Sequence, residues 1–297
     1  MGKASRKKRT SEPKAQRAPY VGRPFEGLAH ESDWVAMREI LPAATAPVTV
    51  VVPEGTEVDG RPVPAGEHEI TLASVLPGAI PALKRDNGDV LAGMQSRTTS
   101  GDASRDIAKA VLTALAAEPG SSVNSVRPAT ADTPRLQDLL ADGQDLEVTV
   151  HEDFGFWLGE EATEEQKAAL EQMNDSAVPM ARVEGAPSAY WCHMTGRSYI
   201  RWILGEDEDT ATRAMARLQA AGEHTLGEGT ELLGAFRAAG LLVPVIEVDA
   251  DAEASTFADA LGELQGRYEK ALTVDEPLTV DERRARDGLV SRQVTLR

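Results

Sequence analysis

The pattern of apolar and polar residues predicts a chain of short strands and amphipathic helices. Its clearest feature is the stretch 189–204, where two bulky runs flank the turn-forming residues 195–198. Along the second run, Ile200, Trp202 and Leu204 alternate with Tyr199, Arg201 and Ile203. Because side chains alternate across a strand, we expect one dry face and one partly wet face. Such a hairpin needs a helix or further strands over it to be stable.

Other turn signals and apolar runs predict further strands. Asp86-Asn87-Gly88 separates the runs 79–83 and 89–96, and Asp59-Gly60 lies in a turn-rich insert, so both sites predict hairpins. Strands are also expected at 48–52, 69–75, 146–151, 154–158, 178–183 and 241–248. Pro244 favours an edge position or a strand start for the last run, because proline cannot donate to the ladder.

Helices are predicted where apolar residues recur every three or four positions behind a capping residue. The first segments are 33–41 capped by Ser32, 102–117 capped by Asp102 or Ser100, and a short helix opened by Thr133-Pro134. A capping box at 163–166 opens a helix to Met173 or Ala177, and further helices are expected at 210–221, 230–239 and 252–272. The last is a short helix from the capping box 279–282 to Gly288. Together with the hairpins they indicate an α+β fold.

The two halves of the chain follow a similar order of elements. Hairpin 79–96 precedes helix 102–117, and hairpin 189–204 precedes helix 210–221. This order predicts two hairpin-plus-helix units, a tandem repeat, forming one or two packed sheets with covering helices. The alternative is that a hairpin followed by a helix is simply a common unit. The expected organisation is a disordered basic arm at 1–22, an N-terminal α+β half at 23–145 and a C-terminal α+β half at 146–297.

Charge is distributed unevenly along the chain. Residues 1–23 carry a net charge of +7, whereas the rest of the chain carries −24. This asymmetry is typical of proteins that contact nucleic acid or another polyanion. The candidate polyanion-binding residues are Lys3, Arg6, Lys7, Lys8, Arg9, Lys14 and Arg17. The alternative is a solubilising tail without a specific partner. The acidic body would repel polyanions, so we expect it to hold a protein partner.

Length and cysteine content narrow the class of protein. The 297 residues are enough for a sizeable core, and no apolar run is long enough to cross a membrane, so no membrane partner is expected. The N-terminus lacks the apolar core of an export signal. Because a single Cys cannot form an internal disulfide, we expect a cytoplasmic protein.

The residues with the most reactive side chains lie in the central hairpin. Cys192 and His193 are adjacent, but neighbours in a strand point to opposite faces and cannot directly form a nucleophile–base pair. A lone Cys beside aromatic residues is more often a packing residue. We therefore assign no catalytic residue and expect no cofactor. The candidate binding face of the hairpin consists of Trp191, Cys192, His193, Arg201 and Trp202.

Ion-binding motifs are weak. No histidine pair has metal-ligand spacing, so no metal site is predicted. The acidic run 206–209 lacks the spaced ligands of a calcium loop, and an acidic helix start is the preferred interpretation. The segments 100–102 and 227–230 precede predicted helices and could hold an anion there, although a plain turn and cap is favoured.

Six segments together carry a resemblance to a known family. They are RPFEGL at 23–28, DWVA at 33–36, SGDASRD at 100–106, AYWC at 189–192, LGEGT at 226–230 and LTVDERRAR at 278–286. From about residue 24 onward the chain resembles an uncharacterised actinobacterial family, a domain of unknown function that often follows a Cys-rich, zinc-binding SEC-C module. No Cys precedes Cys192, so that module is absent and a basic arm stands in its place. The resemblance implies a shared domain architecture and no catalytic residue.

The sequence thus predicts an uncharacterised binding or adaptor protein. Its basic arm would associate with RNA, the ribosome or another polyanion, and its acidic body with a protein partner. One alternative is an enzyme with an unrecognised site near 189–204 that uses Cys192, His193 or Arg201. Another is a chaperone-like structural module, for which a large exposed apolar groove would be the sign.

Overall fold

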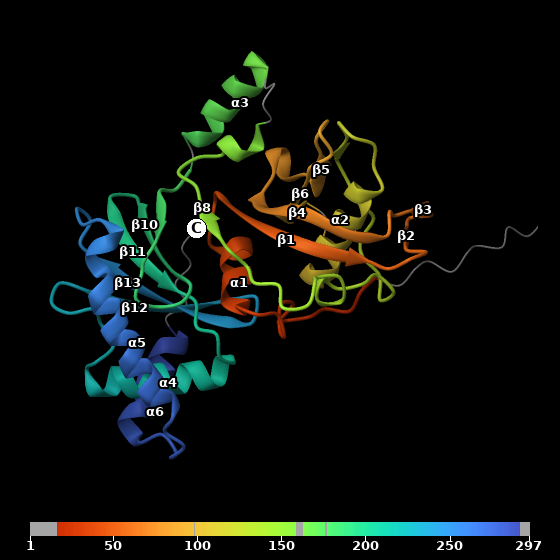
Figure 1. Ribbon diagram of the computed structural model, residues 1–297. Coiled ribbons are helices and arrows are strands. Elements are labelled where there is room, and N and C mark those ends of the chain that lie inside the picture. The colour runs from red at the N-terminus through yellow and green to blue at the C-terminus, as the bar shows by residue number, and fades with distance from the viewer. Residues whose placement is uncertain (1–16, 98, 159–162, 176, 292–297) are drawn as a thin grey trace, which may run out of the picture.

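The computed structural model describes residues 17–97, 99–158, 163–175 and 177–291. Two larger sheets lie on either side of helix α1 (Glu31–Glu39), as Figure 1 shows. The first sheet has the strand order β7-β5-β6-β4-β1-β8, and the second has the order β12-β13-β11-β10-β9. Helices pack against both sheets, which confirms the predicted α+β class.

The first sheet is formed by strands from the N-terminal part of the chain. Its strands are β1 (Ala44–Val52), β4 (Gly66–Val75), β5 (Ala82–Lys84), β6 (Val90–Gln95), β7 (Ser122–Val123) and β8 (Thr149–Val150), and a separate ribbon consists of β2 (Glu57–Val58) and β3 (Arg61–Pro62). β4 and β6 are parallel, and the other pairs are antiparallel. The hairpins β5–β6 and β2–β3 confirm both short turn predictions. At the second turn, Asp59 and Gly60 have the positive φ angles that such a tight turn requires.

Helix α2 (Ala103–Leu115) covers the inner face of the first sheet. Ile107, Val111 and Leu115 are buried, as their spacing predicts. The Asp102 carboxylate accepts hydrogen bonds from the backbone N–H groups of Ser104 and Arg105, which confirms the predicted cap. Short 3₁₀ turns η1 (Pro77–Ala79) and η2 (Leu136–Asp138) lie in the connecting segments.

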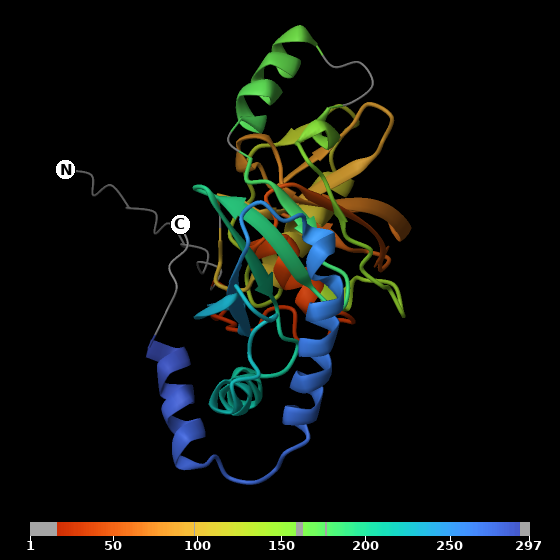
Figure 2. The ribbon, with the colours of Figure 1, turned by 90° about the vertical axis from the view of Figure 1, so that its left-hand side faces the viewer.

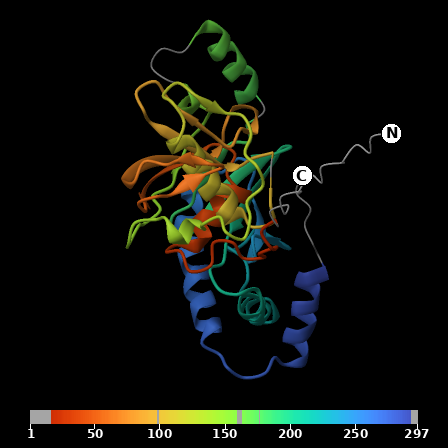
Figure 3. The ribbon, with the colours of Figure 1, turned by 90° about the vertical axis from the view of Figure 1, so that its right-hand side faces the viewer.

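The second sheet is antiparallel throughout. Its strands are β9 (Met180–Arg182), β10 (Ala189–Met194), β11 (Arg197–Trp202), β12 (Glu231–Ala238) and β13 (Leu241–Val248). Helix α3 (Glu164–Asn174) precedes these strands, and α4 (Glu208–Ala221) connects β11 to β12. After β13 come the 3₁₀ turn η4 (Ala254–Phe257), α5 (Ala258–Leu272) and α6 (Val280–Ser291). Figure 2 and Figure 3 show α4 end-on between α5 and α6, while α3 stands apart from the sheets.

Helix α1 is buried on all sides because it lies between the sheets. The six consecutive residues 32–37 are buried, whereas the sequence pattern predicted only one apolar side. One core cluster contains Trp34 and Met37 of α1, Leu72 of the first sheet, and Ile203 and Val243 from the second-sheet side. A second cluster lies between the second sheet and α4, α5 and α6. The first cluster therefore joins both sheets through α1.

A buried polar cluster also connects α1 to the second sheet. The Asp33 carboxylate accepts hydrogen bonds from the Ser188 hydroxyl at 2.6 Å and from the Tyr190 hydroxyl at 3.2 Å. Arg182 of β9 lies 3.9 Å from the other carboxylate oxygen. Burial, and then the charge of Asp33, raise the pKa of Tyr190. The phenol therefore stays protonated and keeps its donor role.

The predicted helix at 230–239 is wrong, because this segment forms strand β12. A bulge between Leu232 and Gly234 shifts its register against β13. As a result Leu232 and Ala235, three residues apart, pack into the same core cluster. The bulge thus gave this strand buried residues at the three-residue spacing that is typical of a helix face.

Other element boundaries also differ from prediction. Residues 154–158 form the 3₁₀ turn η3 (Gly155–Trp157) instead of a strand, and the helix expected after Thr133-Pro134 is only the turn η2. Ser32 lies inside α1 and does not cap it. Gly288 does not end α6, which continues to Ser291.

Pro244 lies in a central strand and not at an edge. β13 is paired with both β12 and β11, but the β11 ladder ends at Arg201 opposite Val245. Pro244 therefore lies just beyond the end of that ladder, where a missing N–H is tolerated.

The tandem repeat and the domain boundaries stay predictions.

Candidate functional site

The central hairpin is formed by β10 and β11, as predicted. Its two-residue turn contains Thr195 and Gly196, whose φ angles are 51° and 77°. Positive φ at both positions matches the right-handed twist of paired strands. The hairpin is not at an edge of the sheet, because β9 and β13 pair with its two outer strands.

One face of the hairpin packs beneath the C-terminal helices. Trp202 is 1% exposed, and its ring meets Tyr268 of α5 edge-on at a centroid distance of 5.1 Å. The Tyr268 hydroxyl donates to Glu206 at 2.6 Å, and burial together with this bond raises the pKa of Tyr268. Trp202 is therefore a core residue and does not form part of an exposed binding face.

Trp191 and His193 occupy the outer part of the same face. Both are half-buried, and their ring centroids are 6.2 Å apart. His193 Nδ1 lies 3.1 Å from the Ser198 hydroxyl, and the indole N–H of Trp191 has no hydrogen-bond partner. The Ser198 hydroxyl is fully buried and also donates to the Ala250 carbonyl at 3.3 Å, and no carboxylate of the described residues forms an ion pair with His193.

The opposite face of the hairpin is buried as well. Tyr199 and Ile203 are 5% and 1% exposed, so the prediction of a partly wet face is wrong. Ile203 packs into the core cluster around α1, whereas Tyr199 packs with Cys192 and Val245 in a smaller cluster; sequence alternation could not reveal these contacts. Cys192 is fully buried here, and its burial raises the pKa of the thiol despite the nearby charge of Arg201.

Arg201 is a buried cation of unusual environment. It is 8% exposed, its Nη2 lies 3.0 Å from the Met194 sulfur, and its Nε has no partner. No carboxylate of the described residues lies within ion-pair distance of it.

The prediction that Cys192 and His193 cannot pair directly is confirmed, since the two side chains lie on opposite faces.

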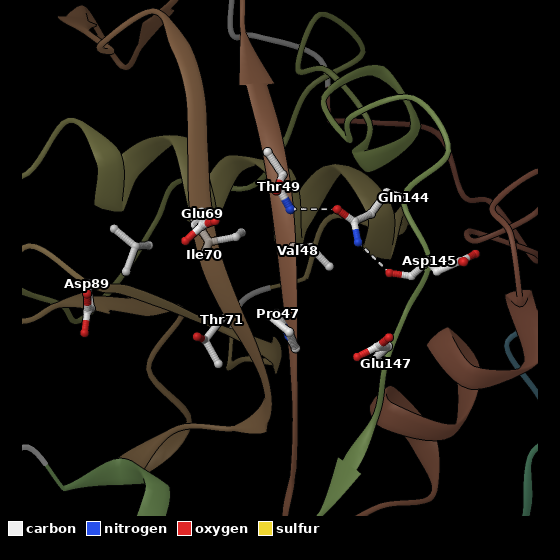
Figure 4. Close-up of a pocket in the computed structure, with 11 residues that line it drawn as sticks. Pro47, Val48, Thr49, Glu69, Ile70, Thr71, Asp89, Gln144, Asp145 and Glu147 are labelled. Carbon is white, nitrogen blue, oxygen red and sulfur yellow. Dashed lines mark hydrogen bonds between the residues drawn. The ribbon is translucent and has the colours of Figure 1, made fainter.

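An open groove lies elsewhere, on the outer face of the first sheet (Figure 4). It has a volume of about 460 Å³ and runs across β4 and β1 to the loop before β8. In the view of Figure 4, Asp89 and Glu69 lie on one side of β1, and Asp145 and Glu147 lie on the other. No basic residue lines this groove. We call this surface the acidic groove.

Two of the four carboxylates of the acidic groove have no ion-pair or hydrogen-bond partner among the described residues. Glu69 and Glu147 are exposed and make no ion pair among the described residues. Asp145 lies 3.4 Å from His30, and the Asp89 carboxylate accepts a hydrogen bond from the side-chain amide of Asn87 at 2.8 Å. Sequence reasoning missed this group because its members lie up to 78 positions apart. The one available signal was the alternation of Glu69 and Thr71 with buried residues along β4.

The edge of β1 beside the acidic groove is blocked against strand addition. Pro47 has no N–H, and the N–H of Thr49 is bonded at 2.9 Å to the side-chain oxygen of Gln144. At the far end, the outer face is covered by Phe156 and Trp157, with the Trp157 indole donating to the Val75 carbonyl at 2.9 Å. The exposed part of the face is therefore limited to the groove.

The candidate anion sites have other roles. Asp102 caps α2 and also lies 3.2 Å from Arg105 and 3.4 Å from Arg135, so its helix start already holds a carboxylate. The segment 227–230 leads into strand β12 and not into a helix. Asp207 caps α4, and hydrogen bonds from Thr210 lower its pKa, which confirms the interpretation of 206–209 as a helix start. No group of three metal-ligating side chains occurs in the described ranges.

Most of the predicted polyanion-binding residues lie outside the described residues, namely Lys3, Arg6, Lys7, Lys8, Arg9 and Lys14. Arg17 is the first residue that the structure describes, and it is exposed. Its backbone bridges to Thr130, and the N–H of Ala18 donates to the Ala129 carbonyl at 3.0 Å. Arg17, which follows the basic segment in the sequence, is therefore attached to the folded body beside Thr130.

Comparison with known proteins gives a family and no activity. The model of the family of unknown function DUF5926 matches residues 24–297. The chain belongs to this family. No curated protein and no solved structure matches the chain. Within the described residues of this DUF5926 member, no helix is both long and apolar enough to span a bilayer.

Proposed function

We propose that this chain is a cytoplasmic binding protein that associates with RNA, the ribosome or another polyanion through its basic N-terminal arm. One observation carries the proposal: residues 1–23 have a net charge of +7, while the rest of the chain has −24. A body of that charge repels polyanions, so the arm supplies the attraction. The acidic body would then hold a protein partner.

The attachment of the arm supports this function. Arg17 and Ala18 are held to the segment around Thr130 by backbone contacts. A polyanion bound by the arm would therefore stay close to one side of the body. This geometry suits an adaptor, which brings two partners together at a defined separation.

The central hairpin gives little support to the enzyme alternative. Cys192 is inaccessible, and its raised pKa keeps the sulfur in the unreactive thiol form. The exposed large apolar side chains of the described residues are scattered, which gives no support to a chaperone-like groove; they are Tyr20, Val51, Met173, Val274 and Val280.

Co-sedimentation tests the function directly. The intact protein and a variant lacking residues 1–16 are centrifuged with ribosomes or RNA over a series of salt concentrations. We expect only the intact protein to co-sediment, and to dissociate as salt rises. Binding that does not depend on salt, or that survives the deletion, would refute the electrostatic arm.

A further inference from the structure

The acidic groove is an exposed sheet face with unneutralised charge. Four carboxylates line it, and neither Glu69 nor Glu147 has an ion-pair partner among the described residues. Neutral side chains, among them Pro47, Thr49 and Thr71, lie between the two acidic sides. Like charges held together without counter-charges repel each other, so a cationic occupant would lower the free energy of this face.

The chain itself contains a segment of matching charge. Residues 1–16 include six basic side chains and a single acid, Glu12. They are rich in polar residues and lack an apolar pattern of their own. Such a segment can lie extended along a surface and place several cations against fixed carboxylates, each pair being worth little alone but several acting together.

The segment is long enough to reach the acidic groove. The backbone of Arg17 is bridged to Thr130, so Thr130 marks where the basic segment is attached. Gln144 of the groove lies fourteen residues after Thr130, and Lys3 lies fourteen residues before Arg17. Fourteen extended residues span about 46–50 Å. Because the chain between Thr130 and Gln144 contains the turn η2 and is not fully extended, the distance between these two residues is shorter than this limit. The basic segment can thus extend from its attachment point to the groove.

We propose that residues 1–16 dock on the acidic groove of their own chain and are displaced when a polyanion binds them. This deepens the proposed function, because it names what occupies the arm when its external partner is absent. The groove then acts as a competitor that weakens non-specific binding to polyanions. The blocked edge at Pro47 and Thr49 means that the segment binds over the face by its charges and not as an added strand.

A peptide-binding measurement tests this proposal without any RNA. A labelled peptide of residues 1–17 is titrated at low salt against the variant lacking residues 1–16, and binding is followed by fluorescence anisotropy. We expect saturable binding that weakens as salt increases. The double variant Glu69→Gln/Glu147→Gln should bind at least about five-fold more weakly, because each carboxylate is unpaired and exposed.

A matched control separates the groove from the general charge of the body. Glu228→Gln/Glu253→Gln changes the net charge equally at exposed positions that do not line the groove, and it should leave the affinity unchanged. The intact protein should bind the peptide at least about five-fold more weakly than the deletion variant, because its own segment competes. Absence of binding, an equal effect of both double variants, or equal affinity of the intact and deleted proteins would each overturn the proposal. A failure of RNA co-sedimentation would refute the proposed function, and with it the displacement by a polyanion, but not the docking of residues 1–16 on the groove.

Discussion

Replacement of Asp33 by Ala tests whether the buried contact between α1 and β10 holds the two sheets together. Asp33 is 6% exposed and is the shared acceptor for the hydroxyls of Ser188 and Tyr190. A hydrogen bond to a charged group contributes about 1.5–3 kcal/mol, and a buried donor left without a partner costs about 1–3 kcal/mol. Ser188 can turn to Ser32, which lies 2.8 Å away, so the main loss falls on Tyr190. We therefore expect the free energy of unfolding to fall by about 3–4 kcal/mol, out of a typical total of about 5–15 kcal/mol.

Urea unfolding followed by tryptophan fluorescence measures this loss. Trp34, next to Asp33 in α1, and Trp202 of β11 are both fully buried, so the emission of the four tryptophans changes when the core opens. Tyr190→Phe should cost about 1–2 kcal/mol, because it removes one hydrogen bond but keeps the ring in the core. The double variant should lose about 1–2 kcal/mol less than the sum of the two single losses, since both changes remove the same bond. A loss below about 1 kcal/mol for Asp33→Ala, or strictly additive losses, would refute the role given to this cluster.

Further predictions concern pH, the thiol and a helix cap. Burial raises the pKa values of Tyr190 and Tyr268, so both phenols stay protonated in the folded chain where the unfolded chain ionises near pH 10. Their contribution to stability is complete below that pH and decreases above it by about 1.4 kcal/mol per pH unit for each tyrosine. Urea midpoints measured between about pH 9 and 11 will show this decrease, and Tyr268→Phe should make it less steep. Cys192 should react with a thiol reagent only as fast as the chain unfolds, and rapid labelling of the native protein would contradict its burial. Asp207→Ala should lower the free energy of unfolding by about 1 kcal/mol, as measured by the urea midpoint, while Asp207→Asn should retain most of the cap.

Local features of the fold were predictable because their causes lie in neighbouring residues. The turn at Thr195-Gly196 and the cap at Asp102 follow from backbone preferences of a few residues. The capping box at Thr279 is formed too, with Glu282 and Thr279 exchanging side-chain and backbone bonds. β12 was misassigned because a bulge is not visible in the spacing of Leu232 and Ala235.

The arrangement of the site depends on contacts between distant residues. Asp33 and Ser188 are 155 positions apart, and nothing in their local sequence indicates that they meet. The acidic groove likewise combines β1, β4 and the loop before β8, whose proximity is set by strand order. The burial of Arg201 likewise depends on strand pairing, because β11 lies between β10 and β13 in the second sheet. Sequence could therefore predict the charge division of the chain, but not where the acidic face lies.

The salt dependence of RNA affinity tests the central claim most directly. The affinity of the intact protein for single-stranded RNA is measured by anisotropy from low to physiological salt. Seven basic side chains, from Lys3 to Arg17, give a slope of log affinity against log salt as steep as about −5, at about −0.7 per neutralised phosphate. The account predicts a slope between about −2 and −5 for the intact chain and no measurable binding for the chain without residues 1–16. Equal affinities and equal slopes for the two proteins would contradict it.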